Sequence, residues 1–162
     1  MTGSSIEAAL NVLYRDGTSV RRKAWDSSTY IKAPKYRFHS PVLVDSEGER
    51  IYVPKIKDFL VTDWESLAGT DLTKIPPEKN GIYRGIMYAF VTGKPIAILG
   101  WYPSTKVFVE DTALKIQYLA NGVEQVTDYI PTREDYLSKE WTPYMEVKDE
   151  RDQGNGNSSE AV

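Results

Sequence analysis

Aromatic and cationic side chains gather in one short segment near the start of the chain. Residues 17–25 read Gly-Thr-Ser-Val-Arg-Arg-Lys-Ala-Trp, so Trp25 closely follows three consecutive cations. An indole ring stacks on a nucleobase with about 1–3 kcal/mol, and arginine donates charge-assisted hydrogen bonds to phosphate oxygens. In an extended strand, alternation places Arg21 and Trp25 on one face. The segment therefore has the chemistry that a ligand containing a purine and a phosphate requires.

The same pattern returns 76 positions later without its cations. Residues 93–101 again have a glycine, a β-branched residue and a final tryptophan at the same spacing, but Ala97, Ile98 and Leu99 replace the basic residues. An apolar strand of this kind is typical of burial on both faces. We therefore expect the first copy to face the ligand and Trp101 to be a packing residue. The alternative is a mixed pocket that Lys94, Tyr102 or a side chain of the first copy completes.

A second pair of segments repeats at an offset of 77. Residues 54–64 and 131–141 share a proline, an inner aspartate, an aromatic-leucine pair and a final acid-tryptophan pair. Each segment predicts a short helix, whose opening amides form an anion cradle. The simpler interpretation is that the aspartates bind turn amides and that Trp64 and Trp141 belong to the core.

These two pairs of segments supply the candidate site, and no catalytic centre or metal site emerges beside it. His39 is the single histidine and we interpret it as structural, while a metal site would have to be all carboxylate. A glycine-rich phosphate loop is absent from the sequence, and no cofactor is expected. A tryptophan in a small α+β protein is more often core than ligand platform, and that interpretation stays open. The candidate ligand-binding residues are Arg21, Arg22, Trp25, Tyr30, Lys55, Asp58, Trp101, Tyr102, Thr132 and Asp135.

The elements that must position these residues are also written twice. Ser4 and Glu7 form a predicted capping box for a helix that ends at Gly17, and the same helical spacing of apolar residues runs from Ile82 to Gly93. Strands then follow in each copy, with Asn-Gly at 121–122 predicting a hairpin turn. The predicted strands are 19–25, 30–33, 37–44, 50–53 and one opening at Trp64, then 95–101, 106–110, 114–119, 126–130 and 141–147.

The fold class that follows is α+β. It consists of tandem duplicated units, each a twisted antiparallel sheet packed on one amphipathic helix plus a short second helix. The predicted boundaries are 1–69 for the first unit, 70–81 for a connector, 82–147 for the second unit and 148–162 for a disordered tail. Because units of this size rarely bury an adequate core alone, we expect them to form a pseudo-two-fold pair. The chain is expected to associate further, as a dimer of tandem chains.

Composition excludes several classes of function. The formal net charge of −3 argues against binding long nucleic acid, which needs a broad basic surface. No apolar run approaches membrane-spanning length and no signal-peptide segment follows Met1, so no membrane partner is expected. The sequence has no cysteine and hence no disulfide or thiolate metal site. A cytoplasmic location is the resulting expectation.

Taken together, these motifs resemble a small phage and prophage family whose best-understood members are the Thoeris anti-defence "sponge" proteins. The resemblance implies a compact antiparallel sheet around a helix, homo-oligomers with ligand pockets between subunits, and no catalysis. It implies sequestration of cyclic-ADP-ribose-type signals or cyclic dinucleotides. Within it, Arg22 rather than Arg21 matches the family pattern, and a bulge before Trp25 reconciles the two. The matching residues are Gly17, Val20, Arg22, Trp25, Pro54, Asp58, Leu60, Asp63 and Trp64, then Gly93, Ile96, Trp101, Pro131, Asp135, Leu137 and Trp141.

Three functions remain in competition. The first is a non-enzymatic binder of a small cyclic nucleotide. The second is a protein–protein inhibitor or accessory phage protein that keeps the fold without the pocket, which the apolar second copy favours. The third is a carboxylate-based nucleotide hydrolase.

Overall fold

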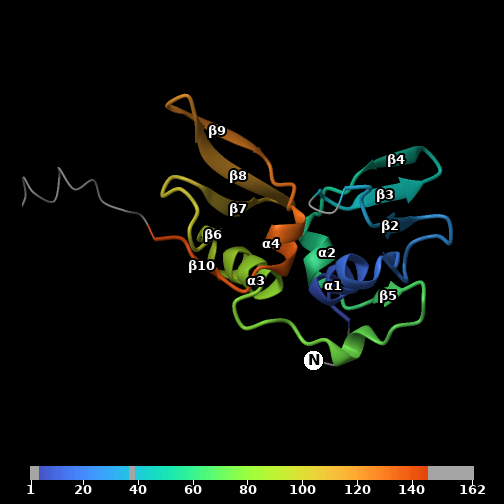
Figure 1. Cartoon of the computed structure of the whole chain (residues 1–162). Helices are drawn as coiled ribbons and strands as arrows, with labels where there is room; N and C mark the ends of the chain where they lie inside the picture. Colours follow the sequence, from blue (N-terminus) through green and yellow to red (C-terminus); the bar gives the residue numbers. More distant parts are fainter. Residues whose placement is uncertain (1–3, 37–38, 146–162) are drawn as a thin grey trace, which may run out of the picture.

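Two similar units lie side by side in the computed structural model, which describes residues 4–36 and 39–145 (Figure 1). Their helices face each other at the centre, and their sheets lie on the outer sides. The first unit contains α1 (Ile6–Asp16), β1 (Val20–Arg22), β2 (Tyr30–Lys32), β3 (Val42–Asp45), β4 (Gly48–Ile51), α2 (Ile56–Leu60) and β5 (Trp64–Ser66). A 3₁₀ turn, η1 (Leu72–Lys74), lies in the connector. The second unit contains α3 (Ile82–Thr92), β6 (Ile96–Ile98), β7 (Lys106–Glu110), β8 (Ala113–Ala120), β9 (Val123–Asp128), α4 (Arg133–Leu137) and β10 (Trp141–Pro143).

The two sheets have the same topology, which agrees with a tandem duplication. Their strand orders are β4-β3-β2-β1-β5 and β9-β8-β7-β6-β10, and every pairing is antiparallel. Each element of the first unit thus has a counterpart in the second, in sequence order and in space. The predicted α+β class is confirmed.

Local sequence explains the ends of the long helices. Gly17 and Gly93 both adopt φ of 70° just after the last helical residue, a conformation that only glycine reaches without strain. The predicted capping box of α1 is wrong in detail. Ser5, not Ser4, is the N-cap, since its hydroxyl accepts from the amide of Ala8. The carboxylate of Glu7 does not cap α1 but accepts hydrogen bonds from the amides of Glu78 and Tyr83.

Strand bounds differ from the sequence prediction mainly at their ends. β1 stops at Arg22 because the chain turns there, with the amide of Trp25 donating to the carbonyl of Arg22 at 3.1 Å. β6 likewise ends at Ile98, three residues before Trp101. At the predicted hairpin, Asn121 and Gly122 both have positive φ, as a type I′ turn needs. Parts of the predicted 37–44 and 141–147 strands, and the tail at 148–162, lie outside the described residues.

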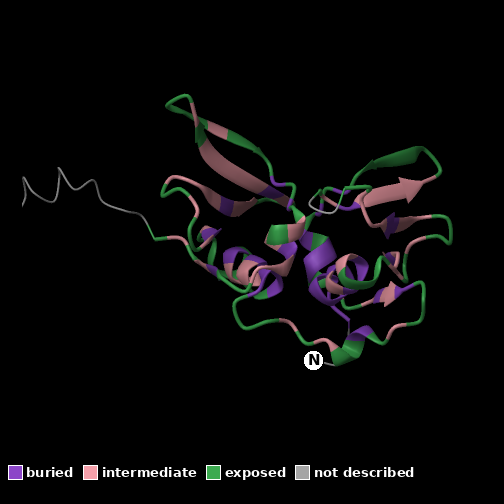
Figure 2. Ribbon diagram, in the orientation of Figure 1, coloured by how far each residue is buried: buried purple, intermediate pink, exposed green. Residues whose placement is uncertain are grey.

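The two units share one hydrophobic core. α1 contacts α4, and the equivalent helices α3 and α2 also contact each other, so the contacts are reciprocal, as a pseudo-two-fold pair requires. Backbone and hydroxyl groups also bond across the boundary: Ser40 Oγ donates to the Pro131 carbonyl at 2.8 Å, and the Ile56 amide donates to the Thr112 carbonyl at 3.2 Å. Buried residues concentrate in the central helices, while the β8–β9 hairpin extends away from them (Figure 2). The structure therefore supports the predicted pairing of the units.

A buried carboxylate joins the units at a second place. Glu7, on α1, is only 2% exposed, and it accepts from the amides of Glu78 at 2.7 Å and Tyr83 at 2.9 Å. Gly81, the N-cap of α3, has no side chain to bond these amides, so a residue of the other unit supplies the cap. A Cβ on Gly81 would lie 2.4 Å from a Glu7 carboxylate oxygen. Glycine is required here by close approach rather than by its φ.

We predict strong coupling between Glu7 and Gly81. Glu7→Ala leaves the buried Tyr83 amide and the partly buried Glu78 amide without their acceptor, and should lower the free energy of unfolding by about 1–3 kcal/mol. Gly81→Ala alone should destabilise by a similar amount, about 1–3 kcal/mol, through its clash with the carboxylate. Because Glu7→Ala removes the clashing group, the double variant should be less destabilised than the sum of the single variants. Urea unfolding of all four proteins measures this, and strict additivity would contradict the contact.

The pH dependence of stability gives a separate prediction. Burial raises the pKa of Glu7 above its ordinary value, and hydrogen bonds from the Tyr83 and Glu78 amides only partly offset this. A raised folded-state pKa contributes stability that is present below the unfolded pKa and is lost as pH rises through the folded pKa. The stability of the natural chain relative to Glu7→Gln should therefore fall as pH rises from about 4 towards neutral. Urea titrations at several pH values test this, and a flat or rising difference would contradict it.

Candidate functional site

Each unit holds a triad of aromatic rings at the end of its first strand. Trp25 lies edge-on to Trp64, with ring centroids 5.4 Å apart, and Tyr52 is 6.4 Å from both. The second unit repeats the arrangement, with Trp101 5.3 Å from Trp141 and both near Tyr129. Trp64 and Trp141 are buried, as predicted, while the first tryptophan of each triad is half-buried. Both half-buried tryptophans therefore pack on the core along one side.

An aspartate holds each triad together. Asp58 Oδ2 accepts from the Tyr52 hydroxyl at 2.7 Å and from the Lys55 amide, and the backbone carbonyl of Asp58 accepts from Trp64 Nε1 at 3.0 Å. The second copy repeats all three bonds about Asp135. The aspartates thus tie a short helix to a hairpin strand and to the closing strand. These bonds agree with the simpler interpretation of the two aspartates, in which they bind turn amides.

The face assignment of Arg21 was wrong. Because the chain turns after Arg22, alternation does not extend from Arg21 to Trp25. β1 pairs with β5 so that Arg22 is opposite Trp64, and this places Arg22, not Arg21, on the face of the triad. Arg21 lies on the other face, where its Nε bonds Glu65 at 2.9 Å. A turn, rather than the bulge suggested above, brings Arg22 and Trp25 to the same side.

Arg22 is held by two carboxylates. Its Nε is 3.1 Å from Asp63 Oδ1, and its Nη1 is 3.9 Å from Asp58 Oδ1. The Arg22 side chain is only 14% exposed. Its guanidinium therefore closes the space beside the first triad with ion pairs inside the unit.

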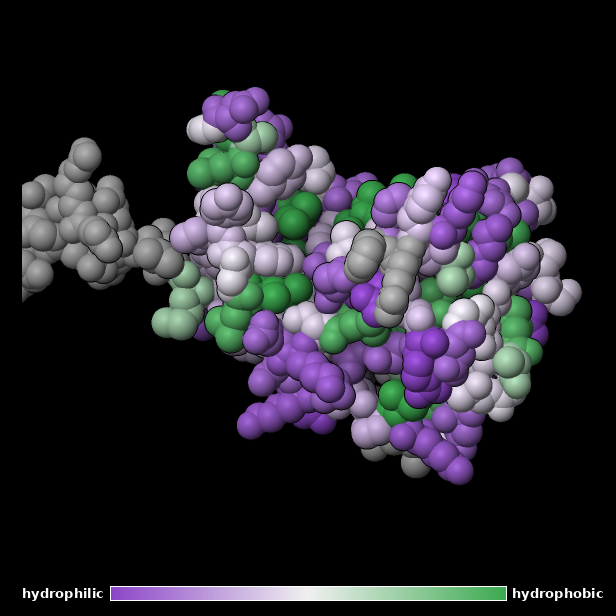
Figure 3. Space-filling view, viewed as in Figure 1, coloured by the Kyte–Doolittle hydropathy of each residue, from purple (hydrophilic) through white to green (hydrophobic). Residues whose placement is uncertain are grey.

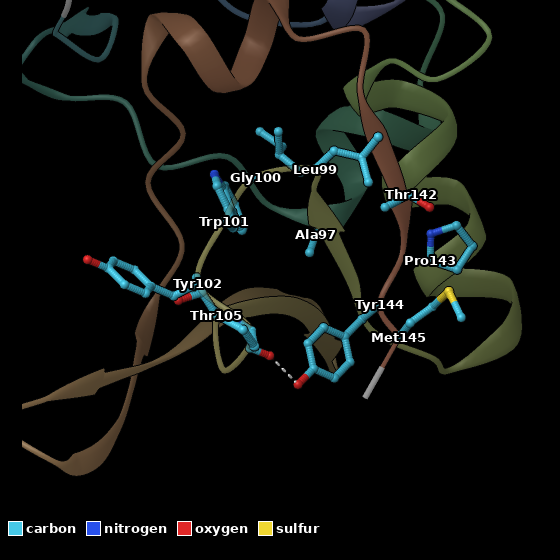
Figure 4. Close-up of a pocket in the computed structure, with 12 residues that line it drawn as sticks. Ala97, Leu99, Gly100, Trp101, Tyr102, Thr105, Thr142, Pro143, Tyr144 and Met145 are labelled. Atoms are coloured by element: carbon cyan, nitrogen blue, oxygen red, sulfur yellow. Dashed lines mark hydrogen bonds between the residues drawn. The ribbon is translucent and has the colours of Figure 1, made fainter. Parts of the chain in front are cut away.

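The second unit has a different side chain at the position of Arg22. Ile98 takes the place of Arg22, opposite Trp141. Beside it, a cavity of about 210 Å³ is walled by aromatic and apolar side chains (Figure 4). Tyr144 forms one wall, and its hydroxyl donates to the Pro103 carbonyl at 2.6 Å. The expectation that this strand is buried on both faces was wrong at Leu99, which is 63% exposed. The lining residues are Ala97, Ile98, Leu99, Gly100, Trp101, Tyr102, Pro103, Thr105, Thr142, Pro143, Tyr144 and Met145.

A second, more polar cavity shares Ile98 and Trp101 with the first. It measures about 650 Å³ and lies against α4 and the segment that follows α4. Arg133 and Lys139 bring two cations to it, and Arg133 Nε is buried without a hydrogen-bond partner among residues 4–36 and 39–145. The remaining lining residues are Glu134, Asp135, Leu137, Ser138 and Glu140.

The predicted site residues do not form one cluster, because the two triads belong to different units. Tyr30 lies on β2 opposite Val44, and Lys55 is an exposed residue at the start of α2. Thr132 caps α4, its hydroxyl accepting from the Asp135 amide at 3.4 Å. Tyr102 is 84% exposed and lines the apolar cavity. Only Trp101, Tyr102 and Asp135, of the predicted residues, line the two cavities.

Arg133, Lys139 and Tyr144 were missed by sequence reasoning. A signal for the two cations was present in the repeat, since Arg133 and Lys139 replace Ile56 and Thr62 of the first copy. The second copy loses the cations of its strand, and around its short helix the two cations lie at other positions than Lys55 and Lys57 of the first copy. Tyr144 carried no such signal. In the part of the chain that the structure describes, no three potential metal ligands gather.

Both half-buried tryptophans should matter for stability. Trp25→Ala and Trp101→Ala each remove a ring from an edge-on triad and should lower the free energy of unfolding by similar amounts, about 2–4 kcal/mol. Trp25 is then a packing residue as well as Trp101. Thermal or urea unfolding of the two variants tests it, with Tyr36→Ala as a control because Tyr36 is exposed. A Trp25→Ala protein as stable as the control would contradict the packing role.

Comparisons of the chain with protein-family models, with curated proteins and with solved structures found no match. What the chain binds must therefore be inferred from its own residues.

Proposed function

We propose that the protein binds and sequesters a small cyclic nucleotide, of the cyclic ADP-ribose or cyclic dinucleotide kind, without chemically changing it. The observation that carries this proposal is the position of Trp101, which walls both an aromatic cavity and a cation-bearing cavity. Bases stack on aromatic rings, and phosphates bind arginine and lysine. One ligand with a base and a phosphate can therefore use both cavities.

The dimensions and lining of the cavities agree with such a ligand. The larger cavity, of about 650 Å³, is broad and open to solvent, so a ligand reaches it without a change in the fold. Arg133 and Lys139, which line this cavity, supply cations for the phosphate of such a ligand. Tyr102 and Tyr144 offer further ring surface on the apolar side. Sequestration needs only binding of this kind.

The biological setting in the proposal comes from the sequence resemblance. The protein is a phage anti-defence protein that removes an immune signal in the host cytosol, as the Thoeris "sponge" proteins do. None of the helices within 4–36 and 39–145 has the length and apolar character needed to cross a membrane.

Self-association is part of the proposal. The apolar cavity is bordered by Leu99, Tyr102 and Met145, all strongly exposed in the single chain. A second chain placed over this border would bury these side chains and exclude water from the ligand. The proposed assembly is a dimer of tandem chains.

A protein–protein inhibitor is the second candidate, and the β8–β9 hairpin favours it. Leu119, Val123 and Val126 are each at least half exposed on this projecting element. Hydrophobic side chains interrupt the hydrophilic surface of the hairpin at the upper left of Figure 3. Exposed apolar side chains on a sheet edge are a feature of protein-binding surfaces.

Uptake and release of cyclic nucleotides separate the candidates. The natural protein is incubated with a panel of cyclic nucleotides, freed of unbound ligand, and heated; the released compounds are then identified by chromatography. We expect one compound to be recovered intact. An altered compound would indicate an enzyme, and no uptake would favour the protein-binding candidate.

Tyr102→Ala localises the site with little structural risk. Because Tyr102 is exposed, its removal should leave the melting temperature nearly unchanged while weakening ligand affinity about tenfold or more, the value of one lost stacking contact. Tyr36→Ala removes an exposed tyrosine that does not line either cavity, so it should bind like the natural protein. Equal affinities in all three proteins would place the ligand elsewhere.

A further inference from the structure

The repeat allows the polar cavity to be compared with the same place in the other unit. In the first unit, Arg22 projects from β1 and its guanidinium faces Asp58 and Asp63. The counterparts of these two acids in the second unit are Asp135 and Glu140, and both line the cavity of about 650 Å³. Ile98 stands where Arg22 stands in the first unit. The two carboxylates have thus been kept while their guanidinium has been removed.

The carboxylate oxygens of the two units are used in the same way. Asp58 binds the tyrosine hydroxyl and the helix-start amide through Oδ2, and its Oδ1 faces Arg22. Asp135 binds Tyr129 and Thr132 through Oδ2 as well. Within residues 4–36 and 39–145, neither Asp135 nor Glu140 has an ion-pair partner. An acceptor oxygen that is matched by a cation in one unit therefore lacks one in the other.

We propose that the second unit receives, between Asp135 and Glu140, a planar ligand group with two adjacent N–H donors, and that Arg22 blocks the equivalent position in the first unit. The ligand group takes the place that the guanidinium of Arg22 occupies. Ile98 is the residue that leaves the position open. Each chain accordingly has one such site.

The chemistry of the ligand follows from this donor pattern, and this step rests on the nucleotide-binding function proposed above. Among nucleobases, guanine has a ring N–H next to an exocyclic amine, and this edge bonds a carboxylate as a guanidinium does. The ring of Trp101 borders the same cavity and offers a stacking surface. Arg133 and Lys139 lie along the same cavity, where they can bind the phosphates. The site is therefore assigned to a guanine-containing nucleotide.

The ionisation of Asp135 agrees with a carboxylate that lacks a cation. Burial raises its pKa above the ordinary value, and the bonds from Tyr129 and Thr132 only partly oppose this. A partly buried carboxylate gains most from a partner that brings donors to its free oxygen.

Guanosine 5′-monophosphate and inosine 5′-monophosphate provide the test, because they differ only by the exocyclic amine. Calorimetry on the full natural chain should show one guanosine nucleotide bound per chain, with inosine monophosphate about tenfold weaker for the loss of one donor to a charged acceptor. Equal affinity for the two nucleotides would overturn the assignment, and so would failure to bind guanosine monophosphate.

Separate substitutions of Ile98 and Arg22 test whether an arginine at this position blocks the ligand. Ile98→Arg should fill the site from within and lower affinity for guanosine monophosphate at least tenfold. The control Leu119→Arg adds the same charge at an exposed position that lines neither cavity, so it should bind like the natural chain. Arg22→Ile should open the first unit and raise the stoichiometry from one to two. If Ile98→Arg binds as the natural chain does, the inference is wrong even if Arg22→Ile fails to fold.

The outcome is separable from that of the proposed function. Uptake of an intact cyclic nucleotide that is insensitive to Ile98→Arg and to the exocyclic amine would leave sequestration standing and remove this inference. Absence of uptake for every nucleotide would remove both.

Discussion

One aspartate holds together the aromatic triad of each unit. Asp58, and Asp135 in its counterpart, accepts a tyrosine hydroxyl and the amide that opens a short helix, while its backbone carbonyl accepts a tryptophan indole. Three segments distant in the strand order are thereby fixed to one point: the end of a hairpin, the short helix and the closing strand. The aromatic triad stacks on the framework that results, and the first strand must turn where it meets the triad.

The same framework is used differently in the two units because of one position. With arginine at position 22, the guanidinium pairs with carboxylates beside the triad, and the surface is closed by the chain itself. With isoleucine at position 98, no cation of the described chain pairs with the equivalent carboxylates, and two cavities have Trp101 in their lining. Duplication allows this division, since one unit is free to act as a scaffold while the other keeps an accessible surface. The cations of the first strand favour the first unit as the one that faces a ligand, but the two cavities described above lie in the second unit.

Contacts between the units couple their structures. Glu7 of the first unit supplies the cap that Gly81 cannot supply to α3, and the helices of the two units form one core. Burying a carboxylate carries a desolvation cost, which the two amide bonds offset in part. The orientation of the open unit is therefore set by contacts with the closed one.

The sequence by itself determined the duplication, the fold class, the helix ends and the hairpin at Asn121, because repeats, apolar spacing and glycine conformation are local properties. It also identified Trp64 and Trp141 as core. Only the tertiary structure showed which arginine shares a face with the aromatic triad and where the cavities lie. Alternation failed after Arg22 because a turn, stabilised by pairing with β5, reverses the chain before Trp25. Whether a charged residue is free to bind a ligand depends on which acids from distant segments lie beside it, and no local pattern contains that information.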